Sequence, residues 1–176
     1  MNWKITTQPE AEPVSLSEAK LHLRVSHDDE DDLIGSLISA ARKWCEDYQG
    51  RSYVTRTITA KVDEFGSSID LPRPPIQSVT SVKYTDSDGT EITVDSDDYE
   101  VDTIGDKVIS DEWPDEQLEV AYVAGYGDAA DVPDLFKAAI KLIVGHLYEN
   151  REQVTSLRVQ DLPMGVVHLL DLDRRF

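Results

Sequence analysis

Apolar residues recur at helical spacing in two long stretches of the chain. Over residues 28–49 they fall at positions i, i+3, i+4 and i+7, and Gly50 follows them as a stop signal. The apolar set is Leu33, Ile34, Leu37, Ile38, Ala41, Trp44, Cys45 and Tyr48. Over residues 133–151, which begin with Pro133 at a first helical position, the apolar arc is wider than a helix on a surface needs. The pattern therefore predicts one amphipathic helix and one central helix with neighbours on more than one side.

The central helix also has a side of small residues. Ala138 and Gly145 lie on it, seven positions apart. Glycine inside a helix costs about 1 kcal/mol relative to alanine. Its presence therefore indicates that another backbone passes close by, either from this chain or from a second copy.

Shorter elements are predicted near both ends. Ser15 and Glu18 have the spacing of a capping box, so a helix is expected at about 16–23. A short helix is expected at about 164–172, within a C-terminal tail of residues 153–176. Residues 1–13 are polar and contain two prolines, which predicts an extended lead-in.

Between the two long helices the hydrophobic period changes to two, which is typical of strands. The predicted strands cover residues 53–62, 78–84, 90–94, 99–101, 107–109 and 118–123. Residues 86–89, Asp-Ser-Asp-Gly, give a hairpin turn signal, and residues 71–75 contain three prolines that a sheet cannot include. The predicted fold class is α+β. It is a small helical bundle, with three main helices and a short C-terminal helix, and an antiparallel β region inserted at about 52–124. All of it is assigned to one domain, residues 1–176.

The strongly negative net charge makes nucleic acid an unfavourable binding partner for this chain. The chain carries a formal net charge of −18, and residues 51–131 alone hold 19 acidic and 6 basic residues. Nucleic acid phosphates would repel such a region, whose simplest role is to keep the protein soluble. The single cysteine, Cys45, excludes an internal disulfide, and its place on an apolar helix face predicts a buried structural thiol. No apolar run is long enough for a membrane span or a signal peptide, so we expect a soluble protein made without export.

Catalytic motifs are absent from the sequence. It has no glycine-rich nucleotide loop, serine hydrolase motif, zinc protease motif or cysteine pair. Two acidic groups offer oxygen ligands to a divalent metal: Asp86, Asp88 and Glu91, and Asp95, Asp97 and Asp98. Neither follows the calcium loop, and aspartate favours turns in any case. We therefore predict no catalytic residue, no cofactor and no metal site, and we interpret His146 as a core histidine.

Five segments between residues 13 and 152 carry a resemblance through their order and spacing. They are PVSLSEAKLHLRV, HDDEDDLIGSLISAARKWCEDYQGR, LPRPPIQSVTSVKYTDSDGT, VAYVAGYGDAADVP and FKAAIKLIVGHLYENRE. In this order they resemble the head–tail connector proteins of tailed bacteriophages and prophages, also called adaptor or head-completion proteins. The resemblance implies a helical bundle with an inserted β region, and a ring, commonly of twelve copies, beneath the portal protein. It implies a structural protein and no enzyme.

The resemblance also implies a place and a set of partners. The protein would be made in the cytoplasm of a bacterial host and would reside in the neck of the virion. It would extend the DNA channel, let DNA pass without specific binding, and dock the tail or the next neck protein, while its C-terminal tail engages the portal. An acidic wall suits such a conduit because it does not hold DNA. The candidate subunit or portal interface residues are Ala138, Gly145, Arg158, Met164, Arg174, Arg175 and Phe176.

Two other functions stay open at this point. One is an acidic binding module that mimics DNA and inhibits a nucleic-acid-binding protein. The other is a metal-dependent hydrolase that uses the clustered carboxylates.

Overall fold

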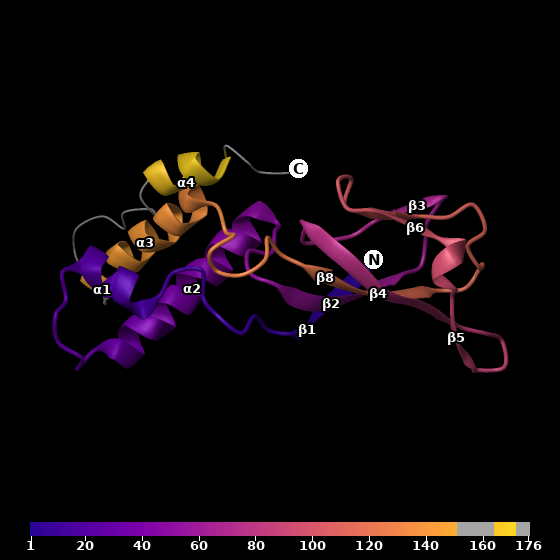
Figure 1. Cartoon of the computed structure of the whole chain (residues 1–176), viewed down its shortest axis with the longest axis horizontal. Coiled ribbons are helices and arrows are strands. Elements are labelled where there is room, and N and C mark those ends of the chain that lie inside the picture. Colours follow the sequence, from indigo (N-terminus) through magenta and orange to yellow (C-terminus); the bar gives the residue numbers. More distant parts are fainter. Residues whose placement is uncertain (151–163, 172–176) are drawn as a thin grey trace. The chain divides into compact units, whose positions relative to one another are not determined.

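The computed structural model describes residues 1–150 and 164–171 (Figure 1). Contacts divide the chain into two compact units. The sheet unit consists of Met1–Glu10 and Arg51–Tyr126, and the helical unit consists of Ala11–Gly50 and the described residues from Gly127 onward. Within the described residues, four helices and antiparallel sheets confirm the predicted mixed α+β class. The assignment of residues 1–176 to one domain stays a prediction.

The sheet unit contains two antiparallel sheets (Figure 1). The larger has the strand order β1-β2-β8-β4-β5, and the smaller has the order β3-β7-β6. The strands are β1 Asn2–Thr7, β2 Arg56–Val62, β3 Ser68–Asp70, β4 Ile76–Thr85, β5 Glu91–Thr93, β6 Glu100–Asp102, β7 Lys107–Ile109 and β8 Leu118–Ala124. A short 3₁₀ helix, η1 (Ser96–Asp98), precedes β6.

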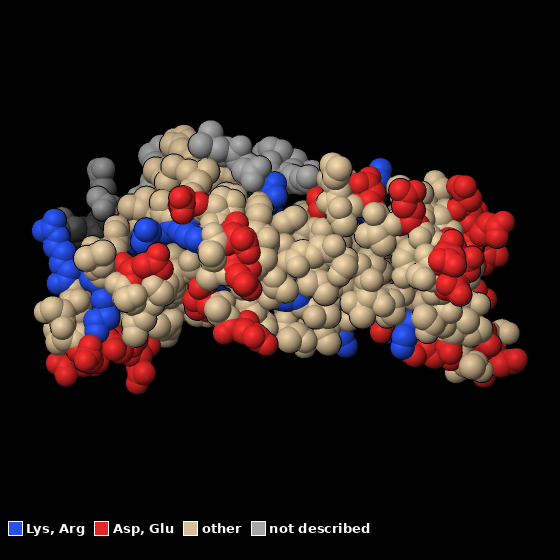
Figure 2. All heavy atoms as spheres, viewed as in Figure 1, with Lys and Arg blue, Asp and Glu red and all other residues tan. Residues whose placement is uncertain are grey.

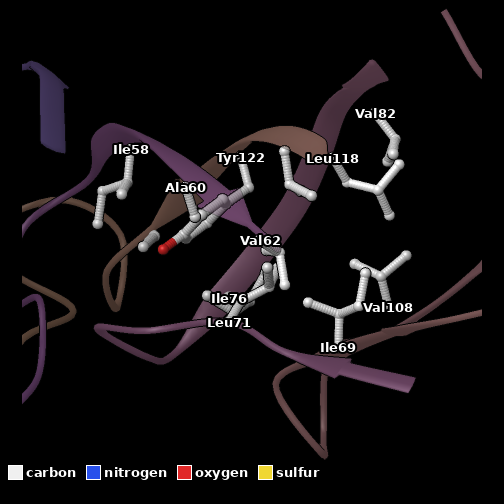
Figure 3. Packing of buried hydrophobic residues seen from close by; sticks show 12 residues of the cluster. Ile58, Ala60, Val62, Ile69, Leu71, Ile76, Val82, Val108, Leu118 and Tyr122 are labelled. Carbon is white, nitrogen blue, oxygen red and sulfur yellow. The ribbon is translucent and has the colours of Figure 1, made fainter. Parts of the chain in front are cut away.

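The alternating pattern of β2 and β8 builds the core of the sheet unit. Every second residue of β8, from Leu118 to Ala124, is buried, and the register pairs Ile58 with Tyr122 and Ala60 with Val120. Figure 3 shows Ile58, Ala60, Leu118 and Tyr122 on one side of the larger sheet, with Ile69 and Val108 of the smaller sheet facing them. The fully or nearly buried cluster comprises Ile58, Ala60, Val62, Ile69, Leu71, Ile76, Val82, Val108, Leu118, Val120, Tyr122 and Ala124. Its apolar area removed from water is the main force that holds the unit together.

Two strands were not predicted. β1, expected to be an extended lead-in, pairs with β2 from Asn2 opposite Lys61 to Thr7 opposite Thr57. It is an exposed edge strand held by backbone hydrogen bonds, so it shows no hydrophobic alternation. β3 has three residues, too few to display a period of two. Because β1 precedes the first helix, the β region is not solely an insertion between the two long helices, and that part of the predicted topology is wrong.

The helices lie close to their predicted ranges: α1 Leu16–Leu23, α2 Asp31–Gln49, α3 Asp134–Glu149 and α4 Met164–Asp171. The capping box is confirmed, because Ser15 Oγ accepts from the Glu18 N–H at 3.2 Å and the Ser15 N–H donates to Glu18 Oε2 at 2.8 Å. Gly50 ends α2 with a left-handed φ of 67°, as expected. Pro133 is the N-cap of α3 and not its first helical residue, a shift of one position.

The four helices pack on one another within the helical unit. Apolar residues of α2 and α3 fill the space between them, and α4 adds two side chains that are fully buried, Val166 and Leu170. Gln49 Nε2 at the end of α2 donates to the Leu170 carbonyl of α4 at 2.9 Å. α4 is therefore an integral part of this unit.

Candidate assembly surfaces

The small-residue side of α3 does not contact another backbone within the chain. A Cβ at Gly145 would lie 3.5 Å from His22 Nε2 of α1, and apart from its own helix no other described atoms except those of the His22 ring lie within 4 Å. The expected close backbone approach is therefore wrong for the single chain. Ala138 and Gly145 are both half-buried, which leaves room for a further contact on this side of α3.

The remaining predicted interface residues lie at the C-terminal end. Arg158, Arg174, Arg175 and Phe176 lie outside the described residues, and Met164 begins α4 with a side chain that is also outside them. α4 itself is held on the helical unit, because Tyr48 Oη donates to Asp171 Oδ1 at 2.7 Å in addition to the Gln49 bond.

Two large apolar side chains are far more exposed than the other large apolar residues that the structure describes. Ile104, in the turn between β6 and β7, is 88% exposed, and Leu21 on α1 is 81% exposed. Leu21 lines a shallow, mainly apolar depression together with Leu16 and Val25. The sequence pattern indicates neither residue as a candidate interface position. A single apolar residue in a polar stretch gives no periodic signal, and scattered surface apolar residues are common.

The acidic character of the chain is concentrated in the sheet unit, which holds 18 acidic and 7 basic residues. Figure 2 shows carboxylates gathered at the end of this unit that carries β5 and η1. Several of them stabilise their own turns: Asp86 Oδ1 accepts from the N–H groups of Asp88 and Thr90, and Asp95 Oδ1 accepts from that of Asp97. Within residues 1–150 and 164–171, no three His, Cys, Asp or Glu side chains are grouped to hold a metal.

A row of alternating charges crosses four strands of the larger sheet. Lys61 Nζ of β2 lies 3.2 Å from Glu119 Oε2 of β8, and Lys83 Nζ of β4 lies 2.6 Å from Glu91 Oε1 of β5. Glu119 is also opposite Lys83 in the register. The hydrogen bond to Glu91, together with the charges of Glu91 and Glu119, raises the pKa of Lys83. These lysines are therefore engaged by the chain's own carboxylates.

Residues 13–111, more than half of the chain, match the model of the phage gp6-like head-tail connector proteins. The chain belongs to this family. The connector also shares its fold with chains in solved structures of gene transfer agent (GTA) particles. In the neck of an empty GTA particle computed with C6 symmetry and in the virion of a native GTA particle, the TM-score is 0.84 at 21% sequence identity. In the neck of a native GTA particle computed with C12 symmetry, the TM-score is 0.81 at 20% identity.

Each of these three alignments covers 100% of the connector and 96% of the other chain. At such low identity the likeness concerns the fold alone. No curated protein sequence matches the connector. The family match confirms the resemblance inferred from the order of the sequence segments.

Cys45 of the connector is a buried structural thiol, as predicted. It is fully buried on α2, and burial, assisted by the nearby Glu46 charge, raises the pKa of the thiol to about 12. Because the thiolate is the nucleophilic form, Cys45 is inert at neutral pH. None of the described helices is long and apolar enough to cross a membrane.

Proposed function

We propose that this connector is a structural virion protein that forms a ring beneath the portal, extends the DNA channel, and docks the tail or the next neck protein. One observation carries the proposal, namely the match of residues 13–111 to the head-tail connector family. The fold shared with chains of GTA particles, including a neck computed with C12 symmetry, supports a ring of twelve copies. In this proposal the connector is made in the cytoplasm of a bacterial host and resides in the neck of the virion.

A closed ring needs two different complementary surfaces on each subunit. The helical unit, as a small bundle, offers two candidates on neighbouring helices. One is the apolar depression on α1 lined by Leu16, Leu21 and Val25, and the other is the half-buried side of α3 that carries Ala138 and Gly145. Burying Leu21 in the ring would remove a largely exposed apolar side chain from water, which would contribute about 1.5–3 kcal/mol.

The charge of the sheet unit suits a conduit for DNA. With 18 acidic and 7 basic residues, it has few cations to replace the counterions on phosphates. DNA would therefore pass without being held. If the acidic end of this unit faces away from the ring lumen in an assembled particle, this part of the proposal is wrong.

The proposal includes no catalytic role. The family is a structural one and is not a class of enzymes. Each of the two acidic clusters contains a carboxylate that accepts backbone hydrogen bonds within its own turn, Asp86 in one and Asp95 in the other. These carboxylates therefore have a structural role that needs no metal. Neither a DNA-mimicking inhibitor nor a metal-dependent hydrolase has an observation that favours it over the connector.

Removing the chain from a producing strain tests the proposal. Heads should still form, but they should lose their DNA and lack tails, because the exit of the portal is neither extended nor capped. Supplying the full chain from a plasmid should restore tailed particles. Particles that retain their genome and carry tails without this chain would contradict the proposal.

Truncation after Asp171 tests the role of the C-terminal end separately. This variant keeps the buried Val166 and Leu170 of α4 but loses Arg174, Arg175 and Phe176. It should fold and yet fail to co-purify with the portal protein. Deleting from residue 158 would be a poorer test, since it would also remove the core residues of α4.

A further inference from the structure

The turn that carries Ile104 is held in one shape by its own hydrogen bonds. Asp102 Oδ1 accepts from the N–H groups of Ile104 and Gly105 at 3.1 and 2.8 Å. A Cβ at Gly105 would collide with the Asp102 carboxylate, so the turn closes tightly around it. Ile104 is therefore presented to solvent by a fixed loop rather than by a loose one.

The base of the same turn is fastened to the connection between β3 and β4. Asp106 is 5% exposed and adopts a left-handed φ of 57°. Its Oδ1 accepts from the Ile76 N–H and its carbonyl from the Leu71 N–H, both at 2.9 Å. The adjoining β7 is anchored by Val108, which Figure 3 shows facing Ile69 inside the core. Little conformational entropy remains for a partner to remove when it covers Ile104, and such preorganisation favours binding.

The surroundings of Ile104 are acidic. The register places Lys107 between Asp70 of β3 and Asp102 of β6, so one cation stands between two carboxylates. The exposed isoleucine thus projects from a negatively charged rim, on a unit with 18 acidic and 7 basic residues. A surface that covers it must combine an apolar pocket with lysine or arginine side chains around that pocket.

Charge disfavours a second copy of this chain as the partner. Of the thirteen lysine and arginine residues in the described part of the chain, six are engaged by the chain's own carboxylates: Lys20, Arg42, Lys43, Lys61, Lys83 and Lys107. The apolar depression on α1 is bordered by Lys20, which Asp28 and Asp31 hold at 2.6 and 2.7 Å. A second copy would bring a further formal charge of −18 to an acidic contact.

We infer, on the basis of the proposed function, that Ile104 is an anchor for a different neck protein, whose surface presents an apolar pocket rimmed by basic residues. The rigid turn inserts the isoleucine into the pocket, and the carboxylates around it pair with the basic rim. Burial of one exposed isoleucine corresponds to about 10- to 100-fold in affinity for each subunit.

Photo-crosslinking in assembled particles tests this contact. A benzophenone amino acid is placed at position 104 of the full chain, and a matched variant carries it at Ser87, in the exposed and equally acidic β4–β5 turn. Position 104 should crosslink to a different particle protein, at a peptide that contains lysine or arginine, and position 87 should not. Crosslinks from 104 to another copy of this chain or to its residues 172–176 would overturn the inference. So would the absence of any crosslink from particles that contain the chain.

Affinity for the crosslinked protein, once purified, gives a second readout. Ile104→Ser should weaken its binding to the full-length connector by about 10- to 100-fold, whereas Ile104→Val and Ser87→Ala should change it less than about 5-fold. Raising the salt concentration should weaken binding further, because the rim is charged. Equal affinities for Ile104→Ser and wild type would overturn the inference.

Different experimental results would contradict the proposed function and the anchor role of Ile104. Particles that lack the chain altogether contradict the proposed function. Particles that contain its ring but leave position 104 free of any other protein contradict only the anchor.

Discussion

The two units of this connector stabilise themselves in different ways. The sheet unit buries an apolar cluster between two sheets and keeps its ladder of paired charges on the surface. Both units also bury charged side chains, namely Arg51, Arg56 and Asp106 in the sheet unit and Arg42 and Glu46 in the helical unit. Arg42 and Glu46 of α2 are 8% and 2% exposed, and Arg42 binds both Glu46, at 2.9 Å, and Glu12, at 2.6 Å. Removing two charges from water costs free energy that offsets much of their attraction. A buried ion pair therefore adds little net stability and mainly fixes the relative positions of the two side chains.

This difference predicts where each unit is fragile. The sheet unit should be sensitive to lost apolar volume and insensitive to changes in its surface charges. The helical unit should be sensitive to the loss of the Arg42 charge on α2, because the buried Glu46 would lose the cation that it binds there.

Tyr122→Ala in the sheet unit should have the largest effect. The side chain is fully buried in the cluster, and its Oη donates to the Pro72 carbonyl at 2.7 Å. Its removal should lower the free energy of unfolding by about 3–5 kcal/mol. Tyr122→Phe removes only the hydrogen bond and should cost about 0.5–1.5 kcal/mol. Urea denaturation measures both, and equal losses would show that packing around the ring is not the main contribution.

Arg42→Ala should cost about 3 kcal/mol, because it leaves the buried Glu46 without this partner. The matched control is Lys43→Ala on the same helix. Lys43 pairs with Asp47 at 2.9 Å, but both side chains are exposed, and the loss should be no more than about 0.5 kcal/mol. Amide hydrogen exchange of α2 separates the helical unit from the sheet unit. Similar protection in the two variants would mean that the buried pair is as weak as the exposed one.

The Cys45 thiol makes the stability of the helical unit depend on alkaline pH. Burial raises its pKa from 9.0 to about 12, so the folded chain holds the proton more tightly than the unfolded chain. The stabilisation is complete below pH 9 and is lost as pH rises toward 12, by at most about 1.4 kcal/mol per pH unit. Cys45→Ala should lack this component of the pH dependence. Rapid labelling of the native thiol at pH 8 would contradict the burial on which the prediction rests.

Gly145→Ala should have only a small effect on the isolated chain, and a larger side chain at the same position tests assembly. The added Cβ meets only the His22 ring at an ordinary distance, so better helix propensity should stabilise the chain by up to about 1 kcal/mol. If a neighbouring subunit approaches this side of α3, the bulkier Gly145→Leu variant should fold and yet fail to form rings. Normal rings from Gly145→Leu would remove α3 from the candidate interfaces.

Features set by neighbours in sequence were predictable. The capping box at Ser15 and the hairpin turn at residues 86–89 each follow from a few adjacent residues, and both are confirmed. The predicted apolar face of α2 is confirmed in part, because Ile34, Ile38, Ala41 and Cys45 are buried but so are the polar Arg42, Glu46 and Gln49. Trp44 belongs to that predicted face but is only half-buried and stacks on Tyr48, so truncating it should cost less than removing a fully buried side chain.

Features set by distant residues were not predictable in the same way. β1 is a strand only because β2, more than 50 residues later, supplies its partners. The space beside Gly145 depends on where α1 places His22, and the exposure of Ile104 depends on how Asp106 fastens its turn. The pattern of apolar and polar residues along the chain does not contain information about contacts between residues that are far apart in the sequence.

The mass of the assembly that the full-length chain forms on its portal protein tests the central claim most directly. Light scattering of the purified complex should give a ring of twelve copies, each of 19.7 kDa, added to the portal. A portal that binds no copies of this chain, or one in which the chain attaches without forming a closed ring, would contradict the account.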